Sequence, residues 1–375
     1  MSAPSAPSLI RSQDALTALC ERLSGSDWFA LDTEFMRERT YYPQLCLIQI
    51  ATPDRAVAID PLAGLDLAPL FRLLHDPQRL KVLHAAWQDL EILAQASGTI
   101  PQPIFDTQIA AQLLGQGEQI GYGRLVEQAL GVTLDKSQAR TDWSRRPLRP
   151  AQLRYALEDV VHLATLYERQ VGALRERDRL DWVLEDCRRL FQSHDLAPDP
   201  DALLRRVRGA RRLPPREQAL ARELAVWRET VARREDKPRK WVLSDEAILD
   251  LVQALPTRRD ELQRLRSLRR PQLAAWGDEL LARLQDLRQR AGRLAAEAGP
   301  ATHTPLTPEE KDRLRALQEA VAERAAALDL PPGALASRRD LERLLRGARD
   351  VPLLTGWRWQ VAGQALAAQL PAAAD

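Results

Sequence analysis

Three groups of side chains in this 375-residue chain have the types and the spacing that chemistry requires, and the first is a pair of acids. Asp32 and Glu34 stand two residues apart in the otherwise apolar run 28–35. In a β-strand this spacing places both carboxylates on one face. Neighbouring carboxylates repel each other, so one becomes protonated unless a cation neutralises them. The pair indicates either a divalent metal site or a strand end whose two acids are solvated.

The other two groups lie on predicted helices. Asp89 comes early in the helix expected over 86–96, where an acid can also simply complement the helix dipole. Tyr155 and Asp159 are four residues apart in a later predicted helix, so they are neighbours on one helix face. Glu158 points about 100° away from Asp159 and is expected in solvent. Taken alone, the Tyr155–Asp159 pair is also typical of a hydrogen bond that orients a core tyrosine.

The runs that must hold these residues alternate between strand and helix in the first half of the chain. Strands are expected over 28–35, 45–51, 56–60 and 81–85. Helices are expected over 86–96, 107–114, 124–130 and 149–170, the second of them with Asp106 as its N-cap. Because the early strands follow one another closely, we expect a mixed sheet that begins antiparallel, in an α/β domain.

After the polar, proline-bearing stretch 193–201, the strand pattern disappears. A helical period extends over 215–292, with breaks at 237–238, 255–257 and 270–271. A second proline-marked linker, 300–308, precedes another helical stretch over 308–373, whose internal turn is expected at 330–333. The similar layouts of the two helical stretches favour a distant internal repeat.

Formal charge is distributed unevenly along the chain. The net charge of +2 comes from 54 basic and 52 acidic residues, and taken alone it argues against a strongly basic nucleic-acid binder. By segment, residues 1–192 carry −4, residues 193–293 carry +7 and residues 294–375 carry −1. The middle segment is rich in arginine, which favours bidentate contacts with phosphate. A GC-rich genome also raises the arginine content, so both explanations stay open.

Three further observations narrow the class of protein. Cys20, Cys46 and Cys187 are few and widely spaced, which favours a reducing compartment, here the cytoplasm, without disulfides or a cysteine-based zinc site. No run approaches 18 consecutive apolar residues, so no membrane-spanning helix is expected. The start of the chain lacks the basic and apolar regions of a secretory signal.

The order of the motifs resembles that of the DEDD exonuclease superfamily. An Asp-x-Glu strand is followed by a further Asp and then by a Tyr-x-x-x-Asp helix. The Tyr subclass fits, because Arg154 stands where the sibling subclass has a histidine. The resemblance implies a ribonuclease-H-like fold whose acids surround two divalent metal ions, Mg²⁺ or Mn²⁺, while a tyrosine orients the attacking water. The residues implied as catalytic are Asp32, Glu34, Asp89, Tyr155 and Asp159, of which the four acids are the metal ligands.

Longer runs are similar to the ribonuclease D family. The runs 32–49 and 134–148 look like its exonuclease motifs, and the run 236–256 looks like an HRDC domain. The fold implied is an α/β ribonuclease-H-like exonuclease domain over 1–200, with a mixed sheet flanked by helices. Two all-α, HRDC-type helical domains are expected to follow, over 210–293 and over 300–375.

The resemblance implies a metal-dependent 3′→5′ exoribonuclease that acts on the 3′ ends of structured RNAs such as tRNA precursors and releases nucleoside 5′-monophosphates. We expect a monomer with no membrane partner and no small-molecule cofactor. A DNA 3′→5′ exonuclease is one alternative, because the same chemistry cuts DNA and HRDC modules also occur in DNA helicases. A catalytically silent RNA-binding scaffold is another, although such a protein has no reason to keep clustered carboxylates.

Residues that could contact RNA fall into three groups. Arg37, Arg39, Tyr41 and Tyr42 follow the first acids, and the two tyrosines either stack on bases or pack against the sheet edge. A loop before the last catalytic helix carries three basic candidates, Lys136, Arg140 and Arg145. The cationic segment contributes Arg234, Lys237, Arg239 and Lys240, which either form a solvated face or track phosphates.

Overall fold

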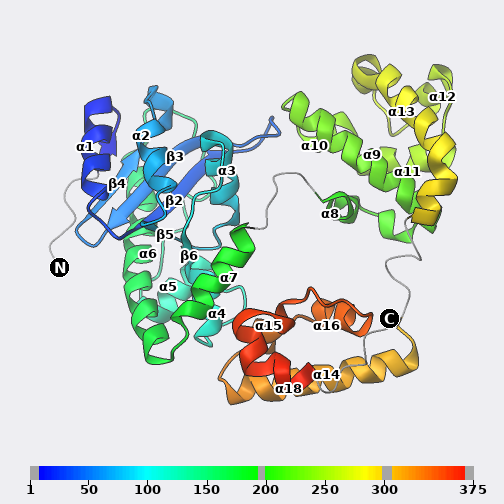
Figure 1. Cartoon of the computed structure of the whole chain (residues 1–375). Helices are drawn as coiled ribbons and strands as arrows, with labels where there is room; N and C mark the ends of the chain where they lie inside the picture. Colours follow the sequence, from blue (N-terminus) through cyan, green and yellow to red (C-terminus); the bar gives the residue numbers. More distant parts are fainter. Residues whose placement is uncertain (1–7, 193–198, 298–305, 368–375) are drawn as a thin grey trace. The chain divides into compact units, whose positions relative to one another are not determined.

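A computed structural model describes residues 8–192, 199–297 and 306–367 of the chain. Figure 1 labels helices and strands of the chain in sequence order. The chain divides into two compact units. The first unit comprises residues 1–36, 44–193 and 306–375, and the second comprises residues 37–43 and 194–305. The C-terminal helical stretch therefore belongs to the same unit as the α/β fold.

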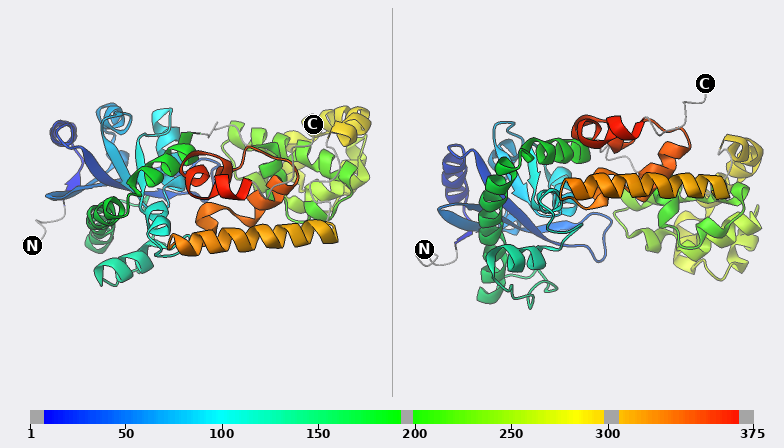
Figure 2. Two further views of the ribbon diagram at one scale, coloured as in Figure 1. Left: turned by 60° about the horizontal axis from the view of Figure 1, so that its bottom comes forward. Right: turned by 90° about the horizontal axis from the view of Figure 1, so that it is seen from below.

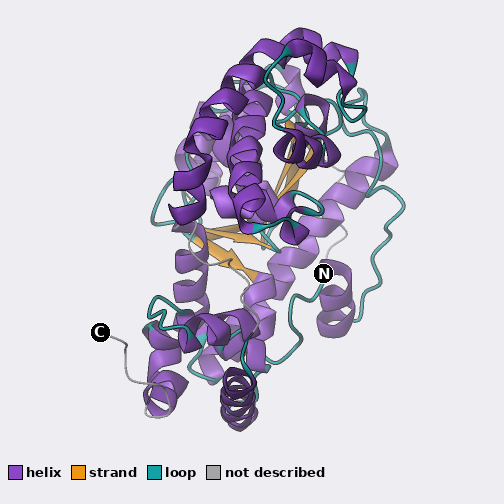
Figure 3. Cartoon of the chain, turned by 90° about the vertical axis from the view of Figure 1, so that its right-hand side faces the viewer, coloured by secondary structure: helices purple, strands orange, loops and turns teal. Residues whose placement is uncertain are grey.

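Within the described part of the first unit, six strands form one mixed sheet, drawn in orange in Figure 3. The strand order is β1-β4-β3-β2-β5-β6. Strands β2, β3 and β4 pair antiparallel, whereas β1 lies parallel to β4, and β5 lies parallel to both β2 and β6. The prediction of a mixed sheet that begins antiparallel is confirmed. The strands are β1 (Leu9–Ile10), β2 (Trp28–Met36), β3 (Gln44–Thr52), β4 (Arg55–Ile59), β5 (Leu80–Leu83) and β6 (Ile104–Asp106).

Within the described residues 8–192, seven α-helices accompany the sheet. The four helices that the sequence predicted are present within a few residues of their expected bounds, except that α6 continues to Glu176. The structure adds β1, β6, α1, α2 and α7, of which the two strands are too short to show a hydrophobic period. The helices are α1 (Gln13–Leu23), α2 (Ala68–Leu74), α3 (Trp87–Ser97), α4 (Thr107–Leu113), α5 (Tyr122–Leu130), α6 (Pro150–Glu176) and α7 (Leu180–Gln192).

Helix α6 is the longest element beside the sheet, and its start is well defined. Pro150 occupies the first helical position, where its fixed φ and missing N–H are tolerated. The backbone N–H of Arg149 donates to the side chain of Gln152 at 3.0 Å, which satisfies a donor at the helix end. Ala156, Val160 and other buried residues of α6 pack towards β2, β3 and β4. This packing sets which face of α6 is turned to the sheet.

The regular elements within the described residues 199–297 are all helices, as predicted. The predicted breaks at 237–238 and 255–257 separate helices, and 270–271 is the start of α13, with proline in its first turn. Of the predicted linker 193–201, residues 193–198 lie outside the described residues, and α8 begins at Pro200. The helices are α8 (Pro200–Arg206), α9 (Pro215–Arg234), α10 (Arg239–Val242), α11 (Asp245–Ala254), α12 (Arg259–Arg264) and α13 (Arg270–Glu297).

The C-terminal helices form a bundle around the long α14, which Figure 2 shows in orange with shorter helices along one side. Thr307 and Glu310 make a reciprocal capping box at the start of α14. Of the predicted turn at 330–333, residues 330–331 lie between α14 and α15 and residues 332–333 begin α15. Residues 300–305 of the predicted linker lie outside the described residues. The helices are α14 (Pro308–Ala327), α15 (Pro332–Leu335), α16 (Arg338–Leu345), α17 (Gly356–Arg358) and α18 (Gln364–Ala367).

A search of the described helices for one that could cross a membrane, judged by length and apolar character, finds none.

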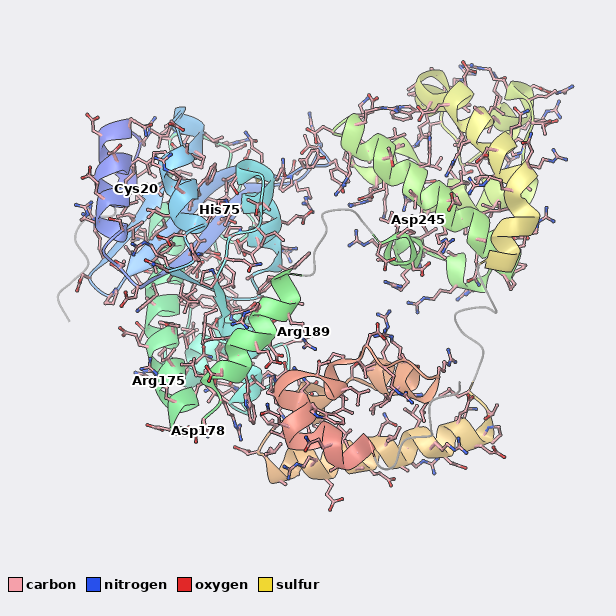
Figure 4. All side chains as sticks on the ribbon, viewed as in Figure 1. Cys20, His75, Arg175, Asp178, Arg189 and Asp245 are labelled. Atoms are coloured by element: carbon pink, nitrogen blue, oxygen red, sulfur yellow. The ribbon has the colours of Figure 1, made fainter. Side chains whose placement is uncertain are left out.

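A buried ion pair connects the C-terminal helices to α7. Asp186 and Arg358 are 6% and 8% exposed, and their Oδ2 and Nη2 atoms lie 2.8 Å apart. The Nε of Arg358 also donates to the carbonyl of Ala334 at 2.7 Å. Arg189, labelled in Figure 4, contacts the same carboxylate from the surface at 3.3 Å. Beside the pair, the rings of Trp182 and Trp357 stack with centroids 4.4 Å apart.

We predict that Asp186→Ala releases the C-terminal helices α14–α18 from α7. Removing one partner of a buried ion pair leaves the other charge uncompensated and costs about 3–5 kcal/mol. The C-terminal helices should therefore open locally before the α/β fold unfolds. Limited proteolysis should show faster cleavage within the C-terminal stretch, and chemical denaturation should show a lower midpoint.

Asp350→Ala is the matched control for this prediction. Asp350 pairs with Arg343 in the same C-terminal stretch, but its side chain is 76% exposed. Solvent and salt screen an ion pair as exposed as this one, so this variant should behave as wild type. Equal protease sensitivity of the two variants would show that the buried pair does not hold the C-terminal helices.

Candidate active site

Strand β2 presents two carboxylates on one face. Asp32 and Glu34 both lie in the strand, and Thr33 between them is buried at 5% exposure. The pairing of β2 with β3 is continuous through Asp32 and Glu34, and a register shift follows between Glu34 and Phe35. Both acids are partly buried. The predicted i, i+2 pair is therefore a rigid feature of a central strand.

Helix α6 brings the third carboxylate to the same place. Asp159 lies where α6 packs on β2, and its carboxylate oxygen and those of Asp32 and Glu34 all lie within 4.8 Å of one another. Tyr155, one turn earlier, hydrogen-bonds the Asp159 carboxylate through its hydroxyl. Glu158 points away and is exposed, as predicted.

Asp89 lines the same cavity in a different orientation. The cavity has a volume of about 250 Å³, and all five predicted catalytic residues line it. Asp89 lies in the first turn of α3, where its Oδ1 accepts a hydrogen bond from the hydroxyl of Thr33 at 2.5 Å. It is therefore held beside the group of three rather than within it.

The electrostatics of the cavity follow from burial and from like charges. Burial, and then repulsion from Asp89, raises the pKa of Asp32 well above its ordinary value. Burial and repulsion from Asp159 raise the pKa of Glu34 to about 8. Burial raises the pKa of Asp159 to about 7 and that of Asp89 to about 6, against hydrogen bonds from Tyr155 and Thr33. Without a cation, the four acids therefore cannot all be ionised at neutral pH.

Tyr155 stays protonated in this environment. Burial and the neighbouring carboxylates raise its pKa above the ordinary value. A phenol with a raised pKa is a poor general base at neutral pH, but it remains a hydrogen-bond donor. Its place in the cavity suits it to orient a reacting molecule.

The structure adds site residues that the sequence did not indicate. Tyr122, at the start of α5, lines the cavity and donates a hydrogen bond from its hydroxyl to the backbone carbonyl of Asp159. The ring of His84 lies against it with centroids 5.3 Å apart. The only local signal was that Tyr122 stands between two glycines, and this says nothing about a partner 37 residues away. The cavity lining also includes Phe35, Gln88 and Leu163.

The predicted RNA-contacting residues of the first unit are exposed. Lys136, Arg140 and Arg145 lie in the loop between α5 and α6. Arg145 pairs with Asp142 at 3.1 Å. Trp143 in the same loop is 2% exposed and packs with Cys46 and its neighbours, so it anchors the loop.

The segment 37–43 belongs to the second unit, and its residues have different environments. Arg37 and Arg39 are exposed, whereas Tyr41 is 7% exposed and belongs to the hydrophobic cluster of that unit. The Tyr41 hydroxyl donates to Oε1 of Glu229 at 2.5 Å, and Tyr42 lies edge-on to the ring of Tyr41. The expectation that these tyrosines pack against the sheet edge is therefore wrong for Tyr41. Its contact with RNA bases stays a prediction that requires Tyr41 to leave this environment.

Three of the four basic residues predicted around α9 and α10 have acidic partners. The Nη2 of Arg239 donates to the buried Glu229 at 2.7 Å, and the Nη2 of Arg234 donates to Glu279 at 2.9 Å. Lys237 lies 3.8 Å from Glu235 and 5.3 Å from the ring centre of Trp276. Lys240 is exposed.

Comparison with known proteins agrees with this geometry. The family described as 3′-5′ exonuclease matches residues 7–170, and the family described as HRDC domain matches residues 217–284. Ribonuclease D of Zymomonas mobilis is 40% identical over 95% of this chain and 92% of its own, and that of Gluconacetobacter diazotrophicus is 40% identical over 95% and 91%.

A solved structure extends the likeness to the whole fold. The crystal structure of Escherichia coli RNase D, described as an exoribonuclease involved in structured RNA processing, has a TM-score of 0.83 and 33% identity to this chain. It covers 97% of this chain and 98% of its own. With the acidic cluster at the expected positions, the chain belongs to the ribonuclease D family of 3′-5′ exoribonucleases.

Proposed function

We propose that this exoribonuclease hydrolyses RNA by a two-metal-ion mechanism at the carboxylates of β2, α3 and α6. The observation that carries the proposal is the approach of Asp32, Glu34 and Asp159 within 4.8 Å in a cavity that Asp89 also lines. Buried like charges at this separation need a cation to be ionised together. Carboxylate oxygens select hard cations, so Mg²⁺ or Mn²⁺ fits this donor set better than zinc.

The proposed roles of the residues follow from their positions. Asp32, Glu34, Asp89 and Asp159 hold the two ions. When bound, such a pair of ions supplies a nucleophile at neutral pH and stabilises the attacking and leaving oxygens of an in-line phosphoryl displacement. The Tyr155 hydroxyl donates its hydrogen bond to the Asp159 carboxylate, and its oxygen can accept a hydrogen bond from the attacking water and so orient it, while its raised pKa keeps the proton in place. The product is a nucleoside 5′-monophosphate.

The proposed substrate is the 3′ end of a structured RNA, such as a tRNA precursor. Support comes from the Escherichia coli relative, whose description names structured RNA processing. We propose that the exposed basic residues contact the RNA backbone, with Arg37, Arg39, Lys136, Arg140, Arg145 and Lys240 as the first candidates. Arg234, Lys237 and Arg239 can contact the RNA only if its phosphates replace the acidic partners of these three side chains.

The proposed organisation is an exonuclease domain over 1–200 and two HRDC-type domains over 210–293 and 300–375, in a monomer that needs no small-molecule cofactor and no membrane partner. Cytoplasmic location is supported by the three cysteines, which are all buried and free.

Substitution of the carboxylates tests the catalytic assignment. Asp32→Asn and Asp159→Ala should each lower the rate of RNA hydrolysis to below about 1% of wild type, because each removes a ligand of the ions that stabilise the transition state. Both variants should stay folded, since each also removes a charge that its neighbours repel. Single-turnover hydrolysis and circular dichroism would measure the two effects. Glu158→Gln, one residue from Asp159 but exposed, should keep full activity.

The pH dependence of stability tests the electrostatics. The folded-state pKa values of Asp89, Asp159 and Glu34, about 6, 7 and 8, lie above the values of about 4 in an unfolded chain. The stability that these groups contribute is present below about pH 4 and is lost as pH rises through the folded-state values. In EDTA, the melting temperature should therefore fall by roughly 5 °C between about pH 5.5 and pH 8.5. Mg²⁺ or Mn²⁺ should restore it, most strongly at the higher pH.

Glu34→Gln provides the comparison for this experiment. Lys81 is fully buried and burial lowers its pKa to about 7, so it opposes the trend. The variant keeps Lys81 but lacks the Glu34 carboxylate, whose pKa of about 8 is the highest of the three values given above. Its melting temperature should therefore fall less between about pH 5.5 and pH 8.5 than that of wild type. An identical slope in wild type and variant would rule out the repulsive cluster.

Digestion of a 3′-extended tRNA tests the substrate. The extension should shorten one nucleotide at a time from the 3′ end, and mass spectrometry of the small products should show 5′-monophosphates. A matched all-DNA oligonucleotide should be cut more slowly than its RNA counterpart. Equal rates on the two oligonucleotides would favour a general 3′-5′ exonuclease, and products with a 3′-phosphate would exclude the proposed chemistry.

A further inference from the structure

Asp106 is a buried acid outside the catalytic cavity whose carboxylate binds three backbone N–H groups. It ends β6 and is 3% exposed. Its Oδ1 accepts from Gln108 at 2.8 Å, which caps α4 as the sequence predicted. The same oxygen accepts from Ala85 at 3.0 Å, and Oδ2 accepts from Ala86 at 2.9 Å. The last two donors belong to the β5–α3 turn, so Asp106 does more than cap its own helix.

The β5–α3 turn needs an outside partner. Ala85 has φ +51°, in the left-handed region, which is strained for a residue with a Cβ. Ala86 is the N-cap of α3, and an alanine side chain cannot accept a hydrogen bond from the first turn. The carboxylate of Asp106 supplies the acceptors that this turn lacks. It thereby fixes the backbone from which α3 begins.

Asp89 lies three residues beyond Ala86, in the first turn of α3. The Asp89 carboxylate accepts a hydrogen bond from the Thr33 hydroxyl at 2.5 Å, and the backbone N–H groups of Thr33 and of Asp89 itself also hydrogen-bond it. These contacts orient the side chain, while the start of the helix sets where the backbone of Asp89 lies. A shift of the turn at 85–86 would move the Asp89 carboxylate relative to Asp32, Glu34 and Asp159, which belong to other elements.

The neighbouring residues tie the same junction together. Thr107 donates its hydroxyl to the carbonyl of Leu83 at 3.2 Å and lies 2.9 Å from Nδ1 of His84. The other ring nitrogen of His84 lies 3.1 Å from the carbonyl of Ile120. Successive residues of the β6–α4 junction thus hold successive residues at the end of β5. Several hydrogen bonds, and not a single one, therefore connect the β6–α4 junction to the end of β5 and the turn that follows it.

We propose that Asp106 is a positioning residue for Asp89, which it holds in the geometry that binds a divalent cation. The inference rests on the proposed two-metal function. Asp106 does not itself line the cavity, although its charge acts on the nearby Asp89 and His84. Its hydrogen bonds reach the site through the backbone of residues 85–86. Its effect should therefore appear in cation binding without substrate.

Asp106→Asn tests the proposal. The amide keeps the size of the side chain but turns one acceptor into a donor that faces a backbone N–H. Partners that orient metal ligands typically contribute about 10–100-fold in metal affinity, so the Mn²⁺ affinity should fall by about that factor. Electron paramagnetic resonance of free Mn²⁺ measures it directly, without RNA. Affinity equal to wild type would overturn the proposal.

Asp60→Asn is the matched control. Asp60 is also a buried N-capping acid, 1% exposed, that accepts from Leu62 and pairs with Arg146. The variant should lower the melting temperature but leave the Mn²⁺ affinity unchanged. If it weakens Mn²⁺ binding as much as Asp106→Asn does, the effect is general destabilisation and the positioning role is wrong.

A double variant covers the case in which Asp106→Asn folds poorly. Ala85→Gly places a residue without a Cβ at φ +51°, and Ala85 is exposed, so little packing is lost. Asp106→Asn with Ala85→Gly should bind Mn²⁺ about 10-fold or more weakly than Ala85→Gly alone. Equal affinities would overturn the positioning role. Absence of Mn²⁺ binding by wild type would instead overturn the proposed two-metal function.

Discussion

The repulsion among buried carboxylates is the constraint on which this structure depends. Asp32, Glu34 and Asp159 approach within 4.8 Å in a setting that raises the pKa of each. A fold does not collect such groups for stability, because burying like charges together costs free energy. The cost is acceptable where a cation binds, since the same closeness that destabilises the metal-free protein increases the affinity for the ion. The site therefore lowers the free energy of unfolding of the metal-free protein, and contacts elsewhere in the fold must hold its acids in place.

The support comes from elements that are far apart in the sequence. Strand β2 fixes the spacing of its two acids, because their backbone is paired to β3, and the strand is also paired to β5 over residues 28–30. Helix α6 is held on the sheet by its apolar face and brings Asp159. Tyr122 from α5 and Asp106 from β6 then hold the backbones that present Asp159 and Asp89. Each acid thus has a partner that opposes its movement away from the others.

The sequence could predict the acids but not the groups that hold them. Asp32 and Glu34 were visible because a strand has a period of two, so their shared face follows from spacing alone. Asp89 was ambiguous, since an acid in the first turn of a helix has a sufficient local explanation, and only the order of the motifs joined it to the site. The contact of Tyr122 with the backbone of Asp159 could not be predicted, because the two residues lie 37 positions apart. The contact of Asp106 with the β5–α3 turn could not be predicted either, because its partners lie about 20 positions away. Both contacts depend on how β5, β6 and α6 are arranged in space.

The partners of the basic residues could not be predicted from the sequence either. Arg239 and Glu229 lie ten residues apart with a helix end between them, so no spacing rule could pair them, yet their side chains are joined in the structure. Residues 193–293 hold 23 basic and 16 acidic residues, so one-to-one pairing of every acid would still leave seven positive charges. Internal pairing therefore changes which arginine or lysine can meet a phosphate without removing the positive field of the segment. The proposal that this segment contacts RNA rests on the surplus of charge, and it holds even if none of the four basic residues first selected makes the contact.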